Sequence, residues 1–187
     1  MMRLKLNNRG FTLVELITAT AILSIVGLSA SAFMVAGART YTSVNYAVRL
    51  QSEAQIVMAQ LQEYTVDCTT GIAWDDSVGT LHIVNGDIVH LFRHDAGTQT
   101  LFYGTSRAAE DLYDTPAELA ALTSALVAEH VTDMDVDLGE GKAEIMLDIQ
   151  RNNKTYHATQ VIALRNQPVA GESWDDLWNG IRSSGEG

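Results

Sequence analysis

The chain has 187 residues, of which 47 % are hydrophobic, and its formal net charge is −11 at neutral pH. A surface with this acidic excess repels the phosphate backbone of nucleic acids, so direct nucleic-acid binding is not expected. The single cysteine, Cys68, excludes an intramolecular disulfide. We expect it to be a small buried side chain near the end of a helix.

The N-terminal segment combines a short basic stretch with an apolar run of membrane length. Arg3, Lys5 and Arg9 precede Gly10, and residues 16–38 contain no charged side chain. The run is long enough to span a bilayer as a tilted helix, with the basic end in the cytoplasm. One carboxylate, Glu15, lies at its start. A lone acid in hydrocarbon costs about 2.5–3.5 kcal/mol on insertion scales, so we expect another group to pair with it.

Residues 9–25, RGFTLVELITATAILSI, resemble the N-terminus of type IV prepilins and type II secretion pseudopilins. The resemblance implies that a membrane peptidase cleaves between Gly10 and Phe11 and methylates the new N-terminus of Phe11. Glu15 then matches the glutamate at the fifth position of the mature subunits. We expect its carboxylate to pair with the Phe11 ammonium of a neighbouring copy.

The resemblance also implies an organisation, partners and a location. We expect a cleaved leader over residues 1–10, a transmembrane or filament-core helix over 11–38, a globular domain over 39–167, and a C-terminal amphipathic segment with a flexible tail over 168–187. The implied partners are other pilin or pseudopilin subunits, the prepilin peptidase, an inner-membrane assembly platform, and lipid before assembly. The chain would cross the cytoplasmic membrane once, N-terminus inside, and then enter a cell-surface or periplasmic filament.

The N-terminal helix is predicted to continue beyond the membrane segment, to about Thr65. No proline interrupts residues 39–64. Apolar side chains recur there at spacings of four, three, four and three residues, which places them on one stripe of a helix. These residues are Leu50, Ala54, Val57, Leu61 and Tyr64. We expect this stripe to pack on a sheet.

Two sets of antiparallel strands, separated by a short helix, are predicted after Gly71. Asn85-Gly86 is the strongest hairpin signal in the chain. Thr115, Pro116 and Glu118 have the types favoured at the cap, first position and third position of a helix, which we expect to run to about Ala128. The strands are predicted from their period of two at residues 80–84, 87–92, 99–103, 130–138, 142–150 and 155–164.

This order of elements predicts an α+β, pilin-like fold, with a long N-terminal helix on antiparallel sheets. The last strand closes in Leu164-Arg165-Asn166, an ending similar to that of J-class minor pseudopilins and PilW-like minor pilins. We therefore expect a minor subunit that initiates or tips a filament for secretion, adhesion or DNA uptake. Two alternatives stay open: a major pilin of the shaft, or a membrane-anchored extracellular binding domain that does not polymerise.

A calcium loop is one candidate for chemistry in the globular domain. The spacing of four acids matches positions one, three, five and twelve of such a loop. Leu138 replaces the glycine of the sharp turn, however, and the alternation of acids with apolar residues favours a half-buried strand. The four acids are Asp133, Asp135, Asp137 and Glu144.

No other residues suggest a catalytic or cofactor site. His82, His90 and His94 fall on neighbouring predicted strands, and we expect them to be solvated rather than metal-binding. The sequence has no nucleophile elbow and no glycine-rich phosphate loop. We therefore expect neither an enzyme nor a bound cofactor.

The C-terminal segment contains one apolar helix face, formed by Trp174, Leu177, Trp178 and Ile181. This face either docks on the domain's own sheet or contacts another minor subunit. The first alternative is slightly favoured, because an exposed pair of tryptophans promotes aggregation. Residues 183–187 are expected to be disordered.

Overall fold

The computed structural model describes residues 12–113 and 115–185, and its chain divides into two compact units, Met1–Asn45 and Tyr46–Gly187. The long helix α1 (Leu13–Val66) contributes residues to both units. The predicted α+β, pilin-like fold with a long N-terminal helix is confirmed.

The described part of the first unit is helical apart from Thr12 and exposes its apolar side chains. Five of its hydroxyl groups donate hydrogen bonds within the helix. Thr18, Thr20, Ser24, Ser29 and Ser31 each donate a hydrogen bond of 2.7–3.0 Å to the carbonyl four residues earlier. By length and composition, α1 is the one helix of the described chain that could cross a membrane.

The second unit contains two sheets. The larger has six strands in the order β5-β4-β3-β2-β1-β9, and the smaller has the order β6-β7-β8. Neighbouring strands are antiparallel, except that β9 runs parallel to β1. The bounds are β1 (Gly71–Asp75), β2 (Thr80–Asn85), β3 (Ile88–Asp95), β4 (Thr100–Arg107), β5 (Ala125–Glu129), β6 (Val131–Gly139), β7 (Lys142–Arg151), β8 (Lys154–Ala163) and β9 (Val169–Gly171).

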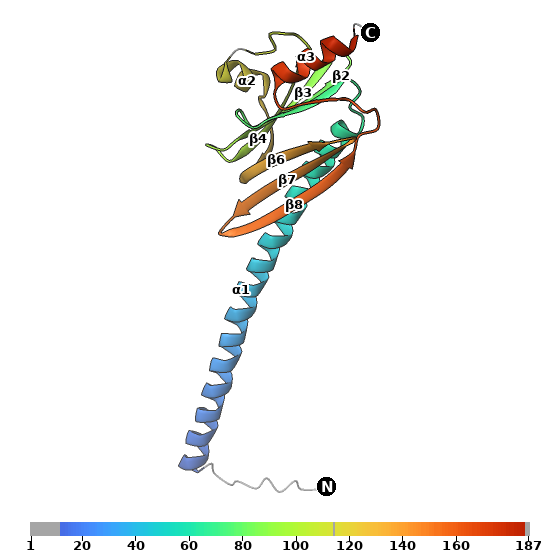
Figure 1. Ribbon diagram of the computed structural model, residues 1–187. Coiled ribbons are helices and arrows are strands. Elements are labelled where there is room, and N and C mark those ends of the chain that lie inside the picture. The colour runs from blue at the N-terminus through green and yellow to red at the C-terminus, as the bar shows by residue number, and fades with distance from the viewer. Residues whose placement is uncertain (1–11, 114, 186–187) are drawn as a thin grey trace, which may run out of the picture. The chain divides into compact units, whose positions relative to one another are not determined.

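The six-stranded sheet is covered on both faces, as Figure 1 shows. One face packs with the predicted α1 stripe and with the inner face of β6-β7-β8 to form the larger core. The other face packs under α2 (Pro116–Leu122) and α3 (Trp174–Gly185) to form a second core. In β2, for example, Leu81 and Ile83 enter the first core, whereas Val84 enters the second.

The six predicted strands correspond to β2, β3, β4, β6, β7 and β8, and two of the hairpin turns between them have residues with positive φ. Asn152 and Asn153 both have positive φ, 50° and 62°, which the two central residues of a tight hairpin turn require. Gly86 has φ 61° in the Asn85-Gly86 hairpin. Strands β1, β5 and β9 were not predicted.

The prediction that the short helix runs to Ala128 is wrong. The capping box of Thr115 with Glu118 is present, but α2 ends at Leu122 and residues 125–129 form β5. The helix end lies directly on β4, since a Cβ at Gly104 would clash with the Leu122 carbonyl oxygen. Residues beyond it pair with the free edge of β4, and this pairing overrides the helix propensity of the Ala-Leu-rich segment.

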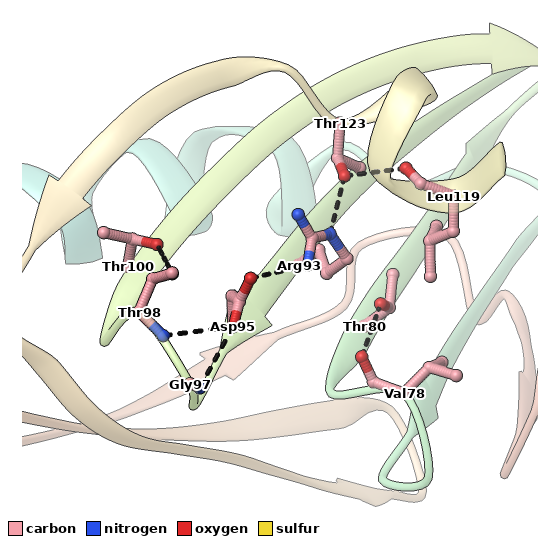
Figure 2. Close-up of polar contacts among 9 residues, drawn as sticks. All are labelled: Val78, Thr80, Arg93, Asp95, Gly97, Thr98, Thr100, Leu119 and Thr123. Carbon is pink, nitrogen blue, oxygen red and sulfur yellow. Dashed lines mark hydrogen bonds and ion pairs between the residues drawn. The ribbon is translucent and has the colours of Figure 1, made fainter. Parts of the chain in front are cut away.

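A polar network fixes the junction between α2 and β5 (Figure 2). The Arg93 guanidinium on β3 donates to the Thr123 hydroxyl at 2.8 Å and lies 3.4 Å from the Asp95 carboxylate. The Thr123 hydroxyl donates in turn to the Leu119 carbonyl at 2.8 Å. Arg93 also lies over the Phe102 ring, 5.0 Å from its centroid. These contacts fix the position of Thr123, two residues before β5 begins.

The C-terminal segment is more ordered than the sequence suggested. Val169–Gly171 pairs with β1, and α3 extends through Ser183 and Ser184 to Gly185, where we expected disorder. The last two residues of that expectation, 186 and 187, lie outside the described residues. The helix continues because its apolar face packs on the sheet and because Ser183 and Ser184 donate to the Gly180 and Ile181 carbonyls.

Candidate functional site

The start of α1 is built by a capping interaction between Thr12 and Glu15. The Glu15 backbone N–H donates to the Thr12 hydroxyl oxygen at 3.3 Å, and the Thr12 hydroxyl lies 3.4 Å from the Glu15 carboxylate. The Leu16 N–H donates to the Thr12 carbonyl at 3.2 Å, which makes Thr12 the N-cap. A carboxylate in the first turn also interacts favourably with the helix dipole.

Glu15 is exposed at this position, within an apolar stretch. Within residues 12–113 and 115–185, its carboxylate contacts only its own helical turn. The predicted cleavage site, Gly10–Phe11, lies outside the described residues. Thr12 was not predicted as a site residue, although its sequence signal is present: a threonine followed three residues later by a glutamate, before an apolar run, is a capping-box pattern.

Comparison with known families matches this same segment. The family model described as the prokaryotic N-terminal methylation motif matches residues 5–31, which include Gly10, Phe11 and Glu15. No curated protein matches the chain. Over these residues the chain is similar to type IV prepilins and pseudopilins, a family of structural subunits. The motif implies processing by a prepilin peptidase and assembly with other pilins, and it agrees with anchoring by one apolar N-terminal helix.

The C-terminal apolar face packs on the chain's own sheet. Trp174 and Leu177 are buried, and Trp178 and Ile181 pack against the same second core. A Cβ at Gly71 would lie 2.6 Å from the Leu177 Cδ1 atom, so the helix approaches β1 as closely as glycine allows. The face therefore docks on the domain's own sheet, the alternative that the sequence slightly favoured. The burial of this face gives no support to partner binding through these four residues.

His82 is fully buried, which contradicts the expectation that the strand histidines are solvated. Its ring lies against Tyr113 and Trp174, its Nε2 is 3.1 Å from the Tyr113 hydroxyl, and its Nδ1 has no hydrogen-bond partner in the described chain. Burial lowers the pKa of His82 to about 4, only partly opposed by the negative charge of Asp75. His82 is buried because Tyr113 and the α3 residue Trp174 lie over this face of the sheet.

The acids of the candidate calcium loop lie on strands. Asp133, Asp135 and Asp137 occupy the exposed face of β6, and Glu144 pairs with Asp137 across the β6–β7 hairpin. Alternate side chains of a strand are roughly 7 Å apart, whereas calcium ligands converge to about 2.3–2.6 Å from one ion. No group of three or more candidate ligands converges in the described chain.

Cys68 occupies the predicted place, buried just after the end of α1. Its Sγ lies 3.0 Å from the Gly71 carbonyl oxygen. Burial raises the pKa of the thiol to about 11, so the thiolate, which is the reactive form, is disfavoured at neutral pH. The side chain contributes to packing of the larger core.

Proposed function

We propose that this chain is a minor pilin or pseudopilin that initiates or tips a short filament used for secretion, adhesion or DNA uptake. The observation that carries the proposal is the methylation motif over residues 5–31, joined to a pilin-like fold. The minor role is supported by the Leu164-Arg165-Asn166 ending and by a single cysteine, which cannot form the disulfide found in many pilins.

In this proposal the peptidase cuts between Gly10 and Phe11, and Glu15 sets the register of the subunit. Phe11, the residue that precedes the N-cap Thr12 in the sequence, would carry the new N-terminal ammonium. The Glu15 carboxylate contacts only its own turn within the described chain and is exposed for contact with a neighbouring subunit. In apolar surroundings an unpaired carboxylate is costly, and the ammonium of a neighbouring subunit would relieve that cost.

The minor role is tested by counting subunits in purified filaments. Filaments sheared from cells that express the chain at its native level should contain it at a small fraction of the amount of the main subunit, measured by quantitative mass spectrometry. Deletion of the chain should reduce the number of filaments and not their diameter. A subunit present in equal or greater amount than every other pilin would be the shaft subunit. A chain found only in the membrane fraction would be a non-polymerising anchor.

A further inference from the structure

An open groove lies between α1 and the edge strand β5, within the second unit. Two hollows of about 410 and 280 Å³ line up along it, and Leu126 and Val127 of β5 border both. The opposite wall is a single stripe of α1 that includes Ile56, Val57 and Tyr64. The two hollows are neighbours that share Leu126 and Val127, and together we call them the β5 groove.

One wall of this groove is an unprotected sheet edge. β5 is the outermost strand of its sheet, and no other strand of the described chain pairs with its outer side. Its sequence, Ala-Leu-Val-Ala-Glu, contains neither the lysine nor the proline that commonly protect edges. Leu126 is 55 % exposed. At the other end of the sheet, β9 has three residues and is covered by α3, since a Cβ at Gly180 would lie 2.7 Å from Val169 Cγ1.

The border of the groove is acidic. Glu53 and Glu129 line the larger hollow and Glu63 lines the smaller one. Glu53 pairs with Arg151 at 3.8 Å, and both side chains are more than 40 % exposed, so this pair is weak. The whole chain is also strongly acidic. A second copy would bring like charge to the groove, whereas a basic segment would be attracted to it.

We propose that the β5 groove binds an extended segment of a different protein, in which apolar and basic residues alternate. The segment adds a strand to the outer edge of β5 through main-chain hydrogen bonds. Its apolar side chains face the hollows beside Leu126 and Tyr64, and its positive charge is attracted by the glutamates that line them. Binding of this segment does not require filament assembly, because every residue of the groove belongs to the second unit of a single chain.

The test uses the full chain in phosphatidylcholine nanodiscs and two acetylated decapeptide probes, one with alternating Val and Lys and one with alternating Val and Glu. The Val-Lys probe should bind, and hydrogen–deuterium exchange of the amides of residues 125–129 should slow. Its affinity should fall as salt is added, because salt screens the attraction between its lysines and the exposed glutamates at the border of the groove. Empty nanodiscs control for binding of the probe to lipid.

Two variants locate the site. Leu126→Lys places a charge on the edge and should weaken Val-Lys binding about tenfold or more, because like charges meet at the rim. Val161→Lys is the matched control, since Val161 is 57 % exposed on β8, an edge strand of the other sheet. It should bind as the unmodified chain does. If Leu126→Lys proves unfolded by circular dichroism, Glu129→Gln serves instead and should also weaken binding.

The outcomes are distinct. Equal binding of the two probes, no slowing of exchange at residues 125–129, or equal loss in Leu126→Lys and Val161→Lys would each overturn the proposal. Slowed exchange at these residues with rising protein concentration, in the absence of probe, would identify the occupant as a second copy and would also overturn it.

Discussion

At the scale of single residues, Glu15 has two separable roles. Its carboxylate belongs to the cap of α1, which requires only an oxygen acceptor, and it provides a negative charge in an apolar segment, which requires a cationic partner. Glutamine preserves the first role and removes the second. The two roles can therefore be distinguished by substitution.

We predict that Glu15→Gln leaves helix formation and leader cleavage intact but sharply reduces incorporation into filaments, because the charge that would pair with the Phe11 ammonium is lost. Breaking one partner of a buried ion pair costs about 3–5 kcal/mol. The measurement is the amount of the variant in sheared filaments relative to the membrane. Thr12→Ala is the matched control: it removes the cap, at about 0.5–2 kcal/mol, and keeps the charge, so it should assemble. Normal incorporation of Glu15→Gln would show that the charge does not set the register.

His82 makes stability depend on pH. Its pKa is about 4 in the folded chain and about 6.5 when unfolded, so the unfolded chain binds more protons between these values. The contribution of His82 to stability is fully present above about pH 6.5 and is lost as the pH falls toward 4. At 1.36 kcal/mol per pKa unit the loss approaches about 3 kcal/mol.

We expect the free energy of unfolding to fall more steeply over this window in the unmodified chain than in His82→Gln, which keeps a hydrogen-bonding group for Tyr113. Urea titrations of the detergent-solubilised chain, followed by circular dichroism at several pH values, measure both. Subtraction of the two curves removes the titration of the carboxylates. Parallel curves would mean that the imidazole is protonated without cost in the fold.

At the scale of elements, α3 is part of the core and not an appendage. Leu177 is 0 % exposed and lies against Gly71 and Gly171, where added Cβ atoms would come within 2.6 and 2.8 Å of it. Trp174 and Trp178 stack at 5.6 Å beside it, and the Trp174 Nε1 donates to the Glu110 carbonyl at 3.3 Å. Truncating the helix face should therefore destabilise the whole second unit.

We predict that Leu177→Ala lowers the free energy of unfolding by about 2–5 kcal/mol, through lost burial and the cavity that is left. Gln55→Ala, an exposed position on α1, should change it by less than about 0.5 kcal/mol. Chemical denaturation followed by tryptophan fluorescence measures both variants. A small effect of Leu177→Ala would indicate that α3 detaches readily from the sheet in solution.

The elements that could be read from the sequence are those with a local signal. The hairpin residues Asn85-Gly86 and the period of two predicted six strands, and the helical stripe predicted the second half of α1. The other three strands have no such signal. β1 and β9 lie side by side under α3, with no period-two alternation in the first and only three residues in the second. The Ala and Leu residues of β5 favour a helix, and the segment is a strand because it pairs with the edge of β4.

At the scale of the whole molecule, the sequence suggests a processing site but gives no sign of the groove. The cleavage motif is contiguous in sequence, so Gly10, Phe11 and Glu15 could be singled out directly. The β5 groove joins α1 to a strand far along the chain, and its existence depends on where α2 ends. His82 was misjudged for a related reason, because what covers a sheet face is decided by distant segments.

Processing itself should be visible in the mass of the exported protein. We predict an N-terminus at Phe11, heavier by one methyl group, and loss of the first ten residues from all assembled material. Gly10→Val should block maturation, because a side chain at this position hinders the approach of the peptidase to the backbone. Top-down mass spectrometry of the membrane and filament fractions provides the measurement. An intact leader in assembled material would contradict the assignment of this site.

The hydroxyl groups along the first half of α1 have one further consequence. Each already donates to a carbonyl of its own helix, so it needs no hydrogen-bond acceptor from the surrounding lipid or protein. Exchange of lipid tails for the flanks of neighbouring helices then breaks no internal hydrogen bond. If the chain assembles as proposed, transfer of this segment between lipid and a filament would then cost little hydrogen-bond enthalpy, and the charge of Glu15 would be the main feature that distinguishes the two environments.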